Sequence, residues 1–296
     1  MRASKTSYWV RQAVDELDRE LSDPTEVLNH INPERLLGDP LIYVDIGARG
    51  GIDPRLNLFR AWLHVVLFEP DPHEFASLKA ADTSGHRVTV MPYAIGDSDK
   101  SSTLYLTRKR ACSSLLEPKG VMSGLLAASV NGAGEEYGSI SRFDVEELVE
   151  VECRTLATAL RDVSPHADIL KIDTQGLELD VLRGLGSYRP FLINVECSTA
   201  ELYKEQGSVF EVGSLLRGLG YFPVRLMGNH LVPGRGSRSR NMLPLHGDCV
   251  FVPDGSPQGR ELIGRSPEKW LTALSTHGFL DLALWQASEF SIEFEK

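Results

Sequence analysis

Short apolar segments alternate with helical patterns along most of this 296-residue chain, and this alternation restricts the fold more than any other feature. Apolar runs of strand length occur at 41–48, 64–70, 87–96, 168–176, 191–197, 221–227 and 248–253. Most of the segments between them carry apolar residues at helical spacing. Strands joined through helices form parallel sheets with right-handed crossovers. The sequence therefore predicts a doubly wound, Rossmann-like α/β fold, with a seven-stranded, mostly parallel sheet and helices on both faces.

The alternation is interrupted once and is extended at both ends. The pattern predicts a helical N-terminal cap at 1–39, a main domain at 40–255 and a C-terminal helical extension at 256–296. Within the main domain, 101–155 predicts an antiparallel addition, and its central loop at 121–140 is rich in small residues. Loops of this length are usually functional or disordered. We expect this loop to contribute contacts to a substrate.

Charge and composition limit the partners. The formal net charge is −10 and no long basic block occurs, so we expect no nucleic-acid partner. No segment reaches the roughly 20 apolar residues that span a bilayer, and the charged N-terminus lacks the apolar core of a signal peptide. The four cysteines lie far apart without metal-ligand spacing. These features predict a cytoplasmic protein with reduced thiols and no membrane insertion, and they leave the oligomeric state open.

The turn after the first apolar run reads "YVDIGARGG" at 43–51 and lies where parallel sheets bind ligands. Its glycines do not match the G-x-G-x-x-G spacing of dinucleotide sites, and no G-K-[ST] of a phosphate-binding loop follows. Asp45 precedes the glycines, and its carboxylate would repel a phosphate held at this turn. The turn therefore favours a ligand with a cationic end.

The second run ends in Glu69, where an acidic side chain commonly accepts hydrogen bonds from ribose hydroxyls. A ribose beside Glu69 and a cationic group beside Asp45 together describe S-adenosylmethionine. The alternative is that both acids only cap the ends of strands. Two consecutive strand ends beside a glycine turn favour the ligand.

Several motifs, in this order and spacing, resemble those of the FkbM-type methyltransferases: "VDIGARGG", "LFEPDP", "AIGDSDKSSTLYLT", "CSSLLEP", "RTLATAL", "LKIDTQGLELDVLRG" and "VECS". The resemblance covers roughly residues 40 to 253. It implies a class I S-adenosylmethionine-dependent O-methyltransferase whose acceptor is a hydroxyl on a sugar, a polysaccharide precursor or a natural product. A hydroxyl leads an amine or carbon acceptor on this resemblance alone.

The resemblance also implies roles for individual residues at the cofactor site. The methionine end would be shaped by Asp45, Gly47 and Gly51. The ribose would be held by Glu69 and oriented by Asp71. The adenine would lie against Ala94 and Ile95, with Asp97 near its amino group. The sequence departs from the family pattern at Arg49 and Gly50, and we expect Arg49 to point outward or to pair with an acid.

The fourth run ends in "LKIDTQGLELD" and supplies candidates for the chemistry. Asp173 ends the strand and could act as general base, or could ligate a divalent metal with Glu196 as partner. The ligand set is incomplete, so a metal is possible but not favoured. Gln175, Glu178 and Glu196 are candidates for contacts to the acceptor. A buried ion pair of Lys171 with Asp173 or Glu178 is the structural alternative for this motif.

His230 is the second candidate base, because it opens the loop after the sixth strand and its ordinary pKa is near neutrality. The other seven histidines show no comparable placement in the sequence. Two other functions remain open. A catalytically inactive, methyltransferase-like binding protein would share the donor pocket, and a nicotinamide-dependent oxidoreductase would share Glu69 but needs the glycine fingerprint that is missing here.

Overall fold

The computed structural model describes residues 27, 29–81, 83, 85–119, 140–226, 229–230, 244–292 and 294. Most of the predicted N-terminal cap, and the loop at 121–139, lie outside the described residues. The division into cap, main domain and extension stays a prediction. No helix in the described part of the chain has the length and apolar character needed to cross a membrane.

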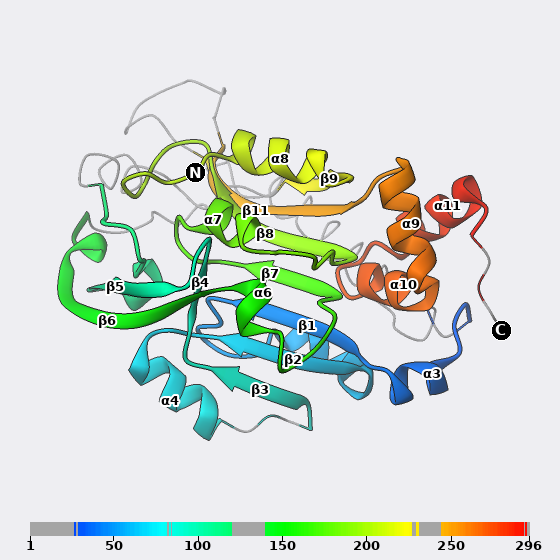
Figure 1. Ribbon diagram of the computed structural model, residues 1–296, viewed down its shortest axis with the longest axis horizontal. Coiled ribbons are helices and arrows are strands. Elements are labelled where there is room, and N and C mark those ends of the chain that lie inside the picture. The colour runs from blue at the N-terminus through cyan, green and yellow to red at the C-terminus, as the bar shows by residue number, and fades with distance from the viewer. Residues whose placement is uncertain are drawn as a thin grey trace, which may run out of the picture.

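A single twisted sheet forms the centre of the molecule (Figure 1). Its strand order is β10-β11-β8-β7-β1-β2-β3, and β9 also pairs with β11. The strands are β1 (Leu41–Ile46), β2 (Leu63–Phe68), β3 (Arg87–Met91), β7 (Ile169–Ile172), β8 (Leu192–Ser198), β9 (Tyr221–Leu226), β10 (Asn229–His230) and β11 (Pro244–Pro253). Strands β3, β2, β1, β7 and β8 run parallel, and β11 is antiparallel to its neighbours. The predicted seven-stranded, mostly parallel α/β fold is confirmed, with the two-residue β10 as an addition.

Both faces of the central strands are covered. Every residue of β1 and β2 is buried, and successive residues of a strand point to opposite faces. The covering helices are α3 (Pro33–Gly38), α4 (Pro72–Ala80), α6 (Leu156–Ala159), α7 (Glu178–Arg183), α8 (Val209–Gly218), α9 (Pro257–Arg265), α10 (Pro267–Ser275) and α11 (Leu280–Phe290), with 3₁₀ turns η1 (Pro54–Trp62), η2 (Arg110–Cys112) and η3 (Ile140–Phe143). The C-terminal helices share one hydrophobic core with the sheet, and the indole of Trp270 is completely buried in it.

The sequence predicts one strand at 87–96, but the structure has two strands there. Strand β3 ends at Met91, and β4 (Ala94–Gly96) leaves the main sheet and pairs with β6 (Val145–Thr155). Pro92 lies between them and has no backbone N–H to continue a strand ladder. The second sheet has the order β4-β6-β5, in which β5 (Lys100–Thr107) pairs antiparallel with β6.

The second sheet lies beyond the carboxyl ends of the parallel strands (Figure 1). The order of the main sheet reverses between β1 and β7, since β2 and β3 lie on one side and β8 and β11 on the other. Parallel sheets bind ligands outside the carboxyl ends of the strands at such a reversal.

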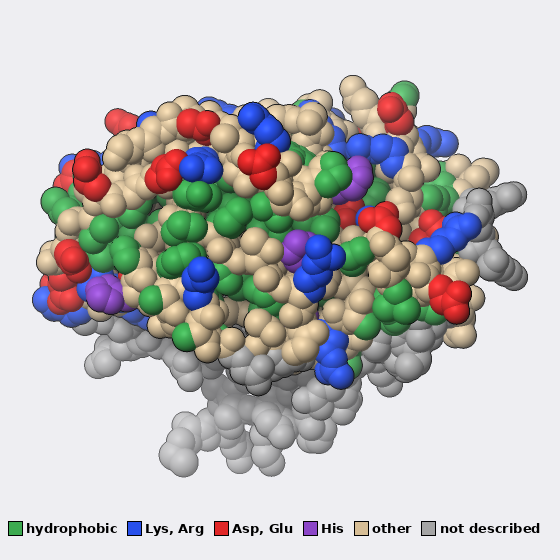
Figure 2. Space-filling view, turned by 60° about the horizontal axis from the view of Figure 1, so that its bottom comes forward, with side chains coloured by type: hydrophobic (Ala, Val, Ile, Leu, Met, Phe, Trp, Pro, Cys, Tyr) green, Lys and Arg blue, Asp and Glu red, His purple; other side chains and the backbone are tan. Residues whose placement is uncertain are grey.

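Acidic and basic side chains are interspersed among apolar ones on the face shown in Figure 2, rather than gathered by sign.

Candidate active site

An open cavity, with about 810 Å³ of space including the solvent at its mouth, lies between the carboxyl ends of the main sheet and the second sheet. From the main sheet and its turns, the lining includes Ile46, Gly47, Phe68, Glu69, Asp173 and Gln175. From the second sheet and the loop after it, the lining includes Tyr93, Ala94, Ile95, Leu104, Arg110 and Ser113. The mixed polar and apolar lining is typical of a site for a small molecule or cofactor.

Glu69 is the buried acid at the end of β2. Only 5% of the residue is exposed, and its Oε1 accepts the backbone N–H of Asp71 at 2.9 Å. Its Oε2 has no hydrogen-bond partner among the described residues. Burial raises the pKa of the Glu69 carboxyl to about 7. The cavity thus holds a carboxylate with an oxygen available to a ligand.

Arg49 joins the turn after β1 to helix α4. Its Nη2 lies 2.6 Å from Asp71 Oδ2, and its Nη1 lies 2.9 Å from Glu74 Oε2. Glu74 also accepts the backbone N–H of Gly50, and Asp71 caps α4 by accepting the N–H of His73. The prediction that Arg49 points outward or pairs with an acid is confirmed. These contacts stabilise the cavity wall and leave Arg49 with two acidic partners.

Gly47 is required by the packing of two turns. Its φ is +81°, and a Cβ at this position would lie 2.0 Å from the carbonyl oxygen of Asp173. The turns after β1 and β7 therefore touch through backbone. Gly51 also has a positive φ, +85°, but it is outside the cavity lining.

We expect Gly47→Ala to lower the free energy of unfolding by roughly 3 kcal/mol or more, because it adds a backbone clash to left-handed strain. Gly50→Ala is the matched control, since Gly50 has a φ of +85° and no atom within 4 Å of its added Cβ. The control should cost only the conformational strain, about 1–2 kcal/mol. Urea denaturation measures both, and equal losses would contradict the role of the Gly47 contact.

Asp45 pairs with Lys171 on the neighbouring strand. The two residues are in register, and Lys171 Nζ lies 3.0 Å from Asp45 Oδ1 and 4.0 Å from Asp173 Oδ2. Asp45 is 2% exposed and does not belong to the cavity lining. Burial raises the pKa of the Asp45 carboxyl against the opposing charge of Lys171. The cation beside Asp45 in this structure is therefore a lysine of the protein itself.

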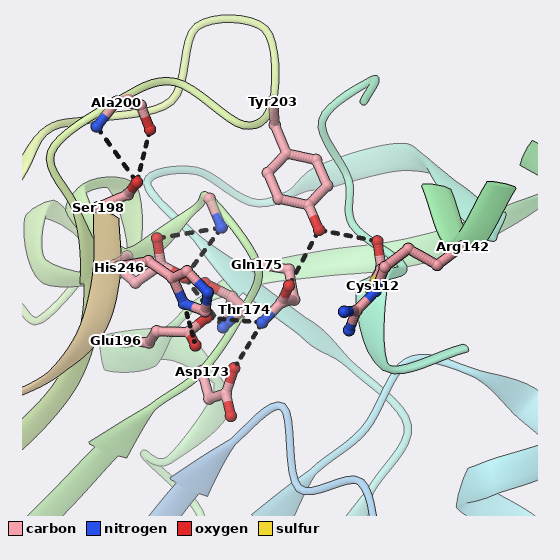
Figure 3. Close-up of polar contacts among 12 residues, drawn as sticks. Cys112, Arg142, Asp173, Thr174, Gln175, Glu196, Ser198, Ala200, Tyr203 and His246 are labelled. Carbon is pink, nitrogen blue, oxygen red and sulfur yellow. Dashed lines mark hydrogen bonds and ion pairs between the residues drawn. The ribbon is translucent and has the colours of Figure 1, made fainter. Parts of the chain in front are cut away.

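Gln175 follows the end of β7 and bridges the carboxylates of Asp173 and Glu196 (Figure 3). Its Nε2 donates to Asp173 Oδ1 at 3.0 Å and to Glu196 Oε2 at 2.6 Å. The hydroxyl of Tyr203 lies 2.9 Å from Gln175 Oε1. Gln175 has a φ of 56°, a left-handed conformation that is uncommon for this residue type and typical of functional sites. Both ends of the Gln175 amide therefore contact side chains of the protein, and its nitrogen orients the carboxylate of Asp173. The side chain of Asp173 is 38% exposed.

Glu196 is held from its other side by His246. Nδ1 of His246 lies 3.3 Å from Glu196 Oε1 (Figure 3). Burial, and then the charge of Asp173, raise the pKa of the Glu196 carboxyl. Asp173 belongs to the cavity lining, whereas Glu196 and His246 do not. The pair of Glu196 and His246 therefore supports the acid that faces the cavity.

Glu178 stabilises the turn that carries Asp173 and Gln175. Its carboxylate accepts the backbone N–H and the hydroxyl of Thr174, and the backbone N–H of Gly176. The residue is 3% exposed, and burial raises its pKa to about 7. The position of Glu178 is explained by these contacts within the turn.

We expect Gln175→Asn to lower turnover roughly tenfold without changing the affinity for the methyl donor that the sequence predicts. Asparagine tolerates the left-handed backbone but is too short to reach both Asp173 and Glu196. Tyr203→Phe, which removes one contact to Gln175 and keeps both carboxylate contacts, should have a smaller effect. Steady-state kinetics measure turnover, and calorimetry measures donor affinity. A Gln175→Asn variant that loses donor affinity instead would show that Gln175 acts at the cofactor.

A family model described as "Methyltransferase FkbM domain" matches residues 45–223. The chain belongs to the FkbM methyltransferase family. The matched range contains every described acid discussed above. A search of curated proteins finds no match. A solved structure of a 1,6-didemethyltoxoflavin-N1-methyltransferase from Burkholderia thailandensis, with bound 1,6-didemethyltoxoflavin and S-adenosylhomocysteine, is 14% identical, covers 84% of each chain and has a TM-score of 0.31. A likeness of this size says nothing further about this chain.

The predicted cofactor residues of this FkbM methyltransferase divide into two groups. Gly47, Glu69, Asp71, Ala94 and Ile95 belong to the cavity lining. The other three, Asp45, Gly51 and Asp97, do not belong to it. Asp45 pairs with Lys171, and Asp97 is exposed and contacts Ser98 and Lys100. The assignment of all eight to the donor remains a prediction.

The predicted acceptor and catalytic residues are brought together with one exception. Asp173, Gln175, Glu178 and Glu196 form one cluster. The structure describes only the backbone of His230, in β10, so its role as a base stays a prediction. Among the described residues, no group of three or more His, Cys, Asp or Glu side chains could hold a metal ion.

Sequence reasoning missed His246, Tyr203 and Arg110. The expectation that no other histidine has a suitable place is wrong for His246, because β11 runs antiparallel to β8 and sets His246 opposite Ser198, close to Glu196. The sequence signal for His246 is weak, because the sequence does not show whether the last strand runs parallel or antiparallel to its neighbours. Tyr203 lies in an irregular loop after β8, where no periodicity marks it. Arg110 is part of "TRKR", which reads as a solvated basic stretch.

Proposed function

We propose that this protein transfers the methyl group of S-adenosylmethionine to a hydroxyl group of a small-molecule or sugar acceptor. The observation that carries the proposal is one cavity that joins Glu69, at the end of β2, to Asp173, at the end of β7. The first suits a ribose and the second suits an acceptor hydroxyl. Membership of the FkbM methyltransferase family supports the same reaction class.

The donor fits the chemistry of the cavity. Glu69 would accept hydrogen bonds from the ribose hydroxyls through the oxygen that has no protein partner. Ala94, Ile95 and Leu104 are buried apolar residues of the lining and would pack against the adenine. Asp71 is already paired with Arg49, so its contribution would be to hold the wall behind the ribose.

Asp173 would take the proton of the acceptor hydroxyl. S-adenosylmethionine supplies a methyl group on a positively charged sulfur, which is already activated for displacement. A hydroxyl must lose its proton as it attacks, and a carboxylate within hydrogen-bond reach can accept that proton. Gln175 holds Oδ1 of Asp173, whereas Oδ2 lies 4.0 Å from Lys171 Nζ, beyond hydrogen-bond distance, so Oδ2 would be the oxygen that meets the substrate. The cavity walls would align donor and acceptor and exclude water.

Calorimetry with S-adenosylmethionine, S-adenosylhomocysteine and NADH tests the donor assignment. We expect the first two to bind and NADH not to bind. Tight binding of NADH alone would favour the oxidoreductase. Transfer of a labelled methyl group to a panel of hydroxylated and amine acceptors then tests the reaction, and donor binding without any transfer across that panel would favour an inactive binding protein.

A further inference from the structure

Arg110 lies in the cavity wall with its guanidinium group only partly paired. Its Nη2 makes a long contact of 3.4 Å to Glu147 Oε2, and its Nη1 is buried without a hydrogen-bond partner. In the described part of the chain, five buried side-chain atoms lack a hydrogen-bond partner, and Arg110 is the one of their residues that belongs to the cavity lining. A buried charged donor is costly to leave unsatisfied. The side chain of Arg110 as a whole is 34% exposed, so a ligand acceptor could reach its guanidinium group and reduce that cost.

The other basic groups near the cavity have strong acidic partners. Arg49 pairs with Asp71 and Glu74, and Lys171 pairs with Asp45. No carboxylate of the described lining pairs with Arg110. Among the described residues, the protein therefore supplies no hydrogen-bond acceptor for Nη1 of Arg110.

The segment that carries Arg110 is anchored on both sides. Before it, the hydroxyl of Thr107 donates to the carbonyl of Lys109 at 2.8 Å, and the N–H of Thr107 donates to Ser113 Oγ. After it, the carbonyl of Cys112 lies 2.9 Å from the hydroxyl of Tyr203, which also contacts Gln175. Arg110 is thus held at the wall of the cavity that also contains Asp173.

We propose that Arg110 binds a carboxylate group of a ligand inside the cavity. A guanidinium group matches the planar geometry of a carboxylate and binds it more strongly than neutral donors do. This inference rests on the proposed function, because it offers two sources of the carboxylate. One is the amino-acid end of the methyl donor, and the other is an acceptor that is itself a sugar acid or another hydroxy acid.

The donor source is tested with two adenosine thioethers. S-adenosylhomocysteine carries the amino acid, and 5′-methylthioadenosine has the same adenosine and sulfur without it. Calorimetry compares the wild type with Arg110→Met. If the carboxylate is that of the donor, Arg110→Met should weaken S-adenosylhomocysteine roughly 10- to 100-fold and 5′-methylthioadenosine less than about twofold.

Arg108→Met is the matched control. Arg108 is an exposed arginine two residues away, paired with Asp144 and Glu146 and outside the cavity lining. Its replacement should change neither affinity. Thermal unfolding of both variants shows whether Arg110→Met remains folded, and Arg110→Lys, which keeps the charge without the planar fork, should bind with intermediate affinity.

The acceptor source is tested with the protein saturated by S-adenosylhomocysteine. Ligand-observed NMR then compares D-glucuronate with neutral methyl D-glucoside. Binding of glucuronate to the wild type but not to Arg110→Met, with both thioether affinities unchanged, assigns the carboxylate to the acceptor. The inference is wrong if Arg110→Met weakens both thioethers equally, or if it changes neither thioether nor glucuronate binding. Failure of both thioethers to bind the wild type would instead contradict the proposed function, and this inference with it.

Discussion

Asp173→Asn is expected to lower the rate of methyl transfer by about a thousandfold, while S-adenosylhomocysteine still binds with nearly unchanged affinity. The amide has the size of the carboxylate, and its oxygen can still accept the hydrogen bond from Gln175 Nε2. It cannot take a proton from the acceptor hydroxyl. Transfer of labelled methyl to any accepted substrate measures the first effect, and calorimetry measures the second. Unchanged turnover would reject a catalytic role for Asp173.

Asp180→Asn is the matched control for this substitution. Asp180 is a carboxylate of helix α7 that pairs with Arg183 at 2.8 Å and is outside the cavity lining. Its replacement should leave turnover and donor affinity unchanged. An EDTA titration of the wild type separates the two roles considered for Asp173. Loss of turnover that a divalent metal restores would make Asp173 a metal ligand rather than a base.

Glu69→Ala is expected to weaken S-adenosylhomocysteine about a hundredfold, because two hydrogen bonds from the ribose to a carboxylate are lost. Glu69→Gln keeps the shape and one acceptor oxygen, so its loss should be smaller. Glu117→Ala is a suitable control, since Glu117 is an exposed acid that pairs with Lys204 outside the cavity lining. Calorimetry measures all three. No loss of affinity in Glu69→Ala would remove the donor assignment.

The raised pKa of Glu69 makes donor binding depend on pH. With a pKa of about 7, this carboxyl is partly protonated near neutrality in the protein without ligand. Ribose hydroxyls donate to the ionised form, so affinity for S-adenosylhomocysteine should rise between pH 6 and pH 8. Glu69→Gln should flatten this dependence, and a wild-type affinity that falls with pH would contradict it.

The same shift affects stability with the opposite sign. The folded protein keeps this proton up to about pH 7, whereas the ordinary pKa of a glutamate carboxyl is 4.5. The contribution of Glu69 to the free energy of unfolding is therefore fully present below pH 4.5 and is lost as pH rises through about 7. Urea denaturation of wild type and Glu69→Gln at pH 5 and pH 8 checks this sign.

The strand pattern was readable from the sequence because buried parallel strands need continuous apolar runs. The acids at the ends of these runs were readable for the same reason, since the first polar residue after a buried strand marks its end. Pro92 shows the limit of this reading. Residues 87–96 look like one apolar run, but the ring of Pro92 interrupts the ladder and sends β4 to a second sheet.

Pairing between distant residues could not be read in the same way. Asp45 was expected to face a cationic ligand, and in the structure it faces Lys171, which lies 126 positions further along the chain. His246 reaches Glu196 only because β11 enters the sheet in the antiparallel direction. Strand order and strand direction decide both contacts, and no local sequence pattern indicates either of them.

The sequence by itself determined the fold class, the FkbM resemblance and the placement of Glu69 and Asp173 at strand ends, because these depend on local periodicity and on motif spacing. Only the tertiary structure decided that Gly47 accommodates the carbonyl of Asp173 and that Arg49 pairs with acids. It likewise decided that Gln175 joins two carboxylates and that Arg110 lies in the cavity lining with one nitrogen that has no hydrogen-bond partner. These contacts join segments that only the folded chain brings within hydrogen-bond distance.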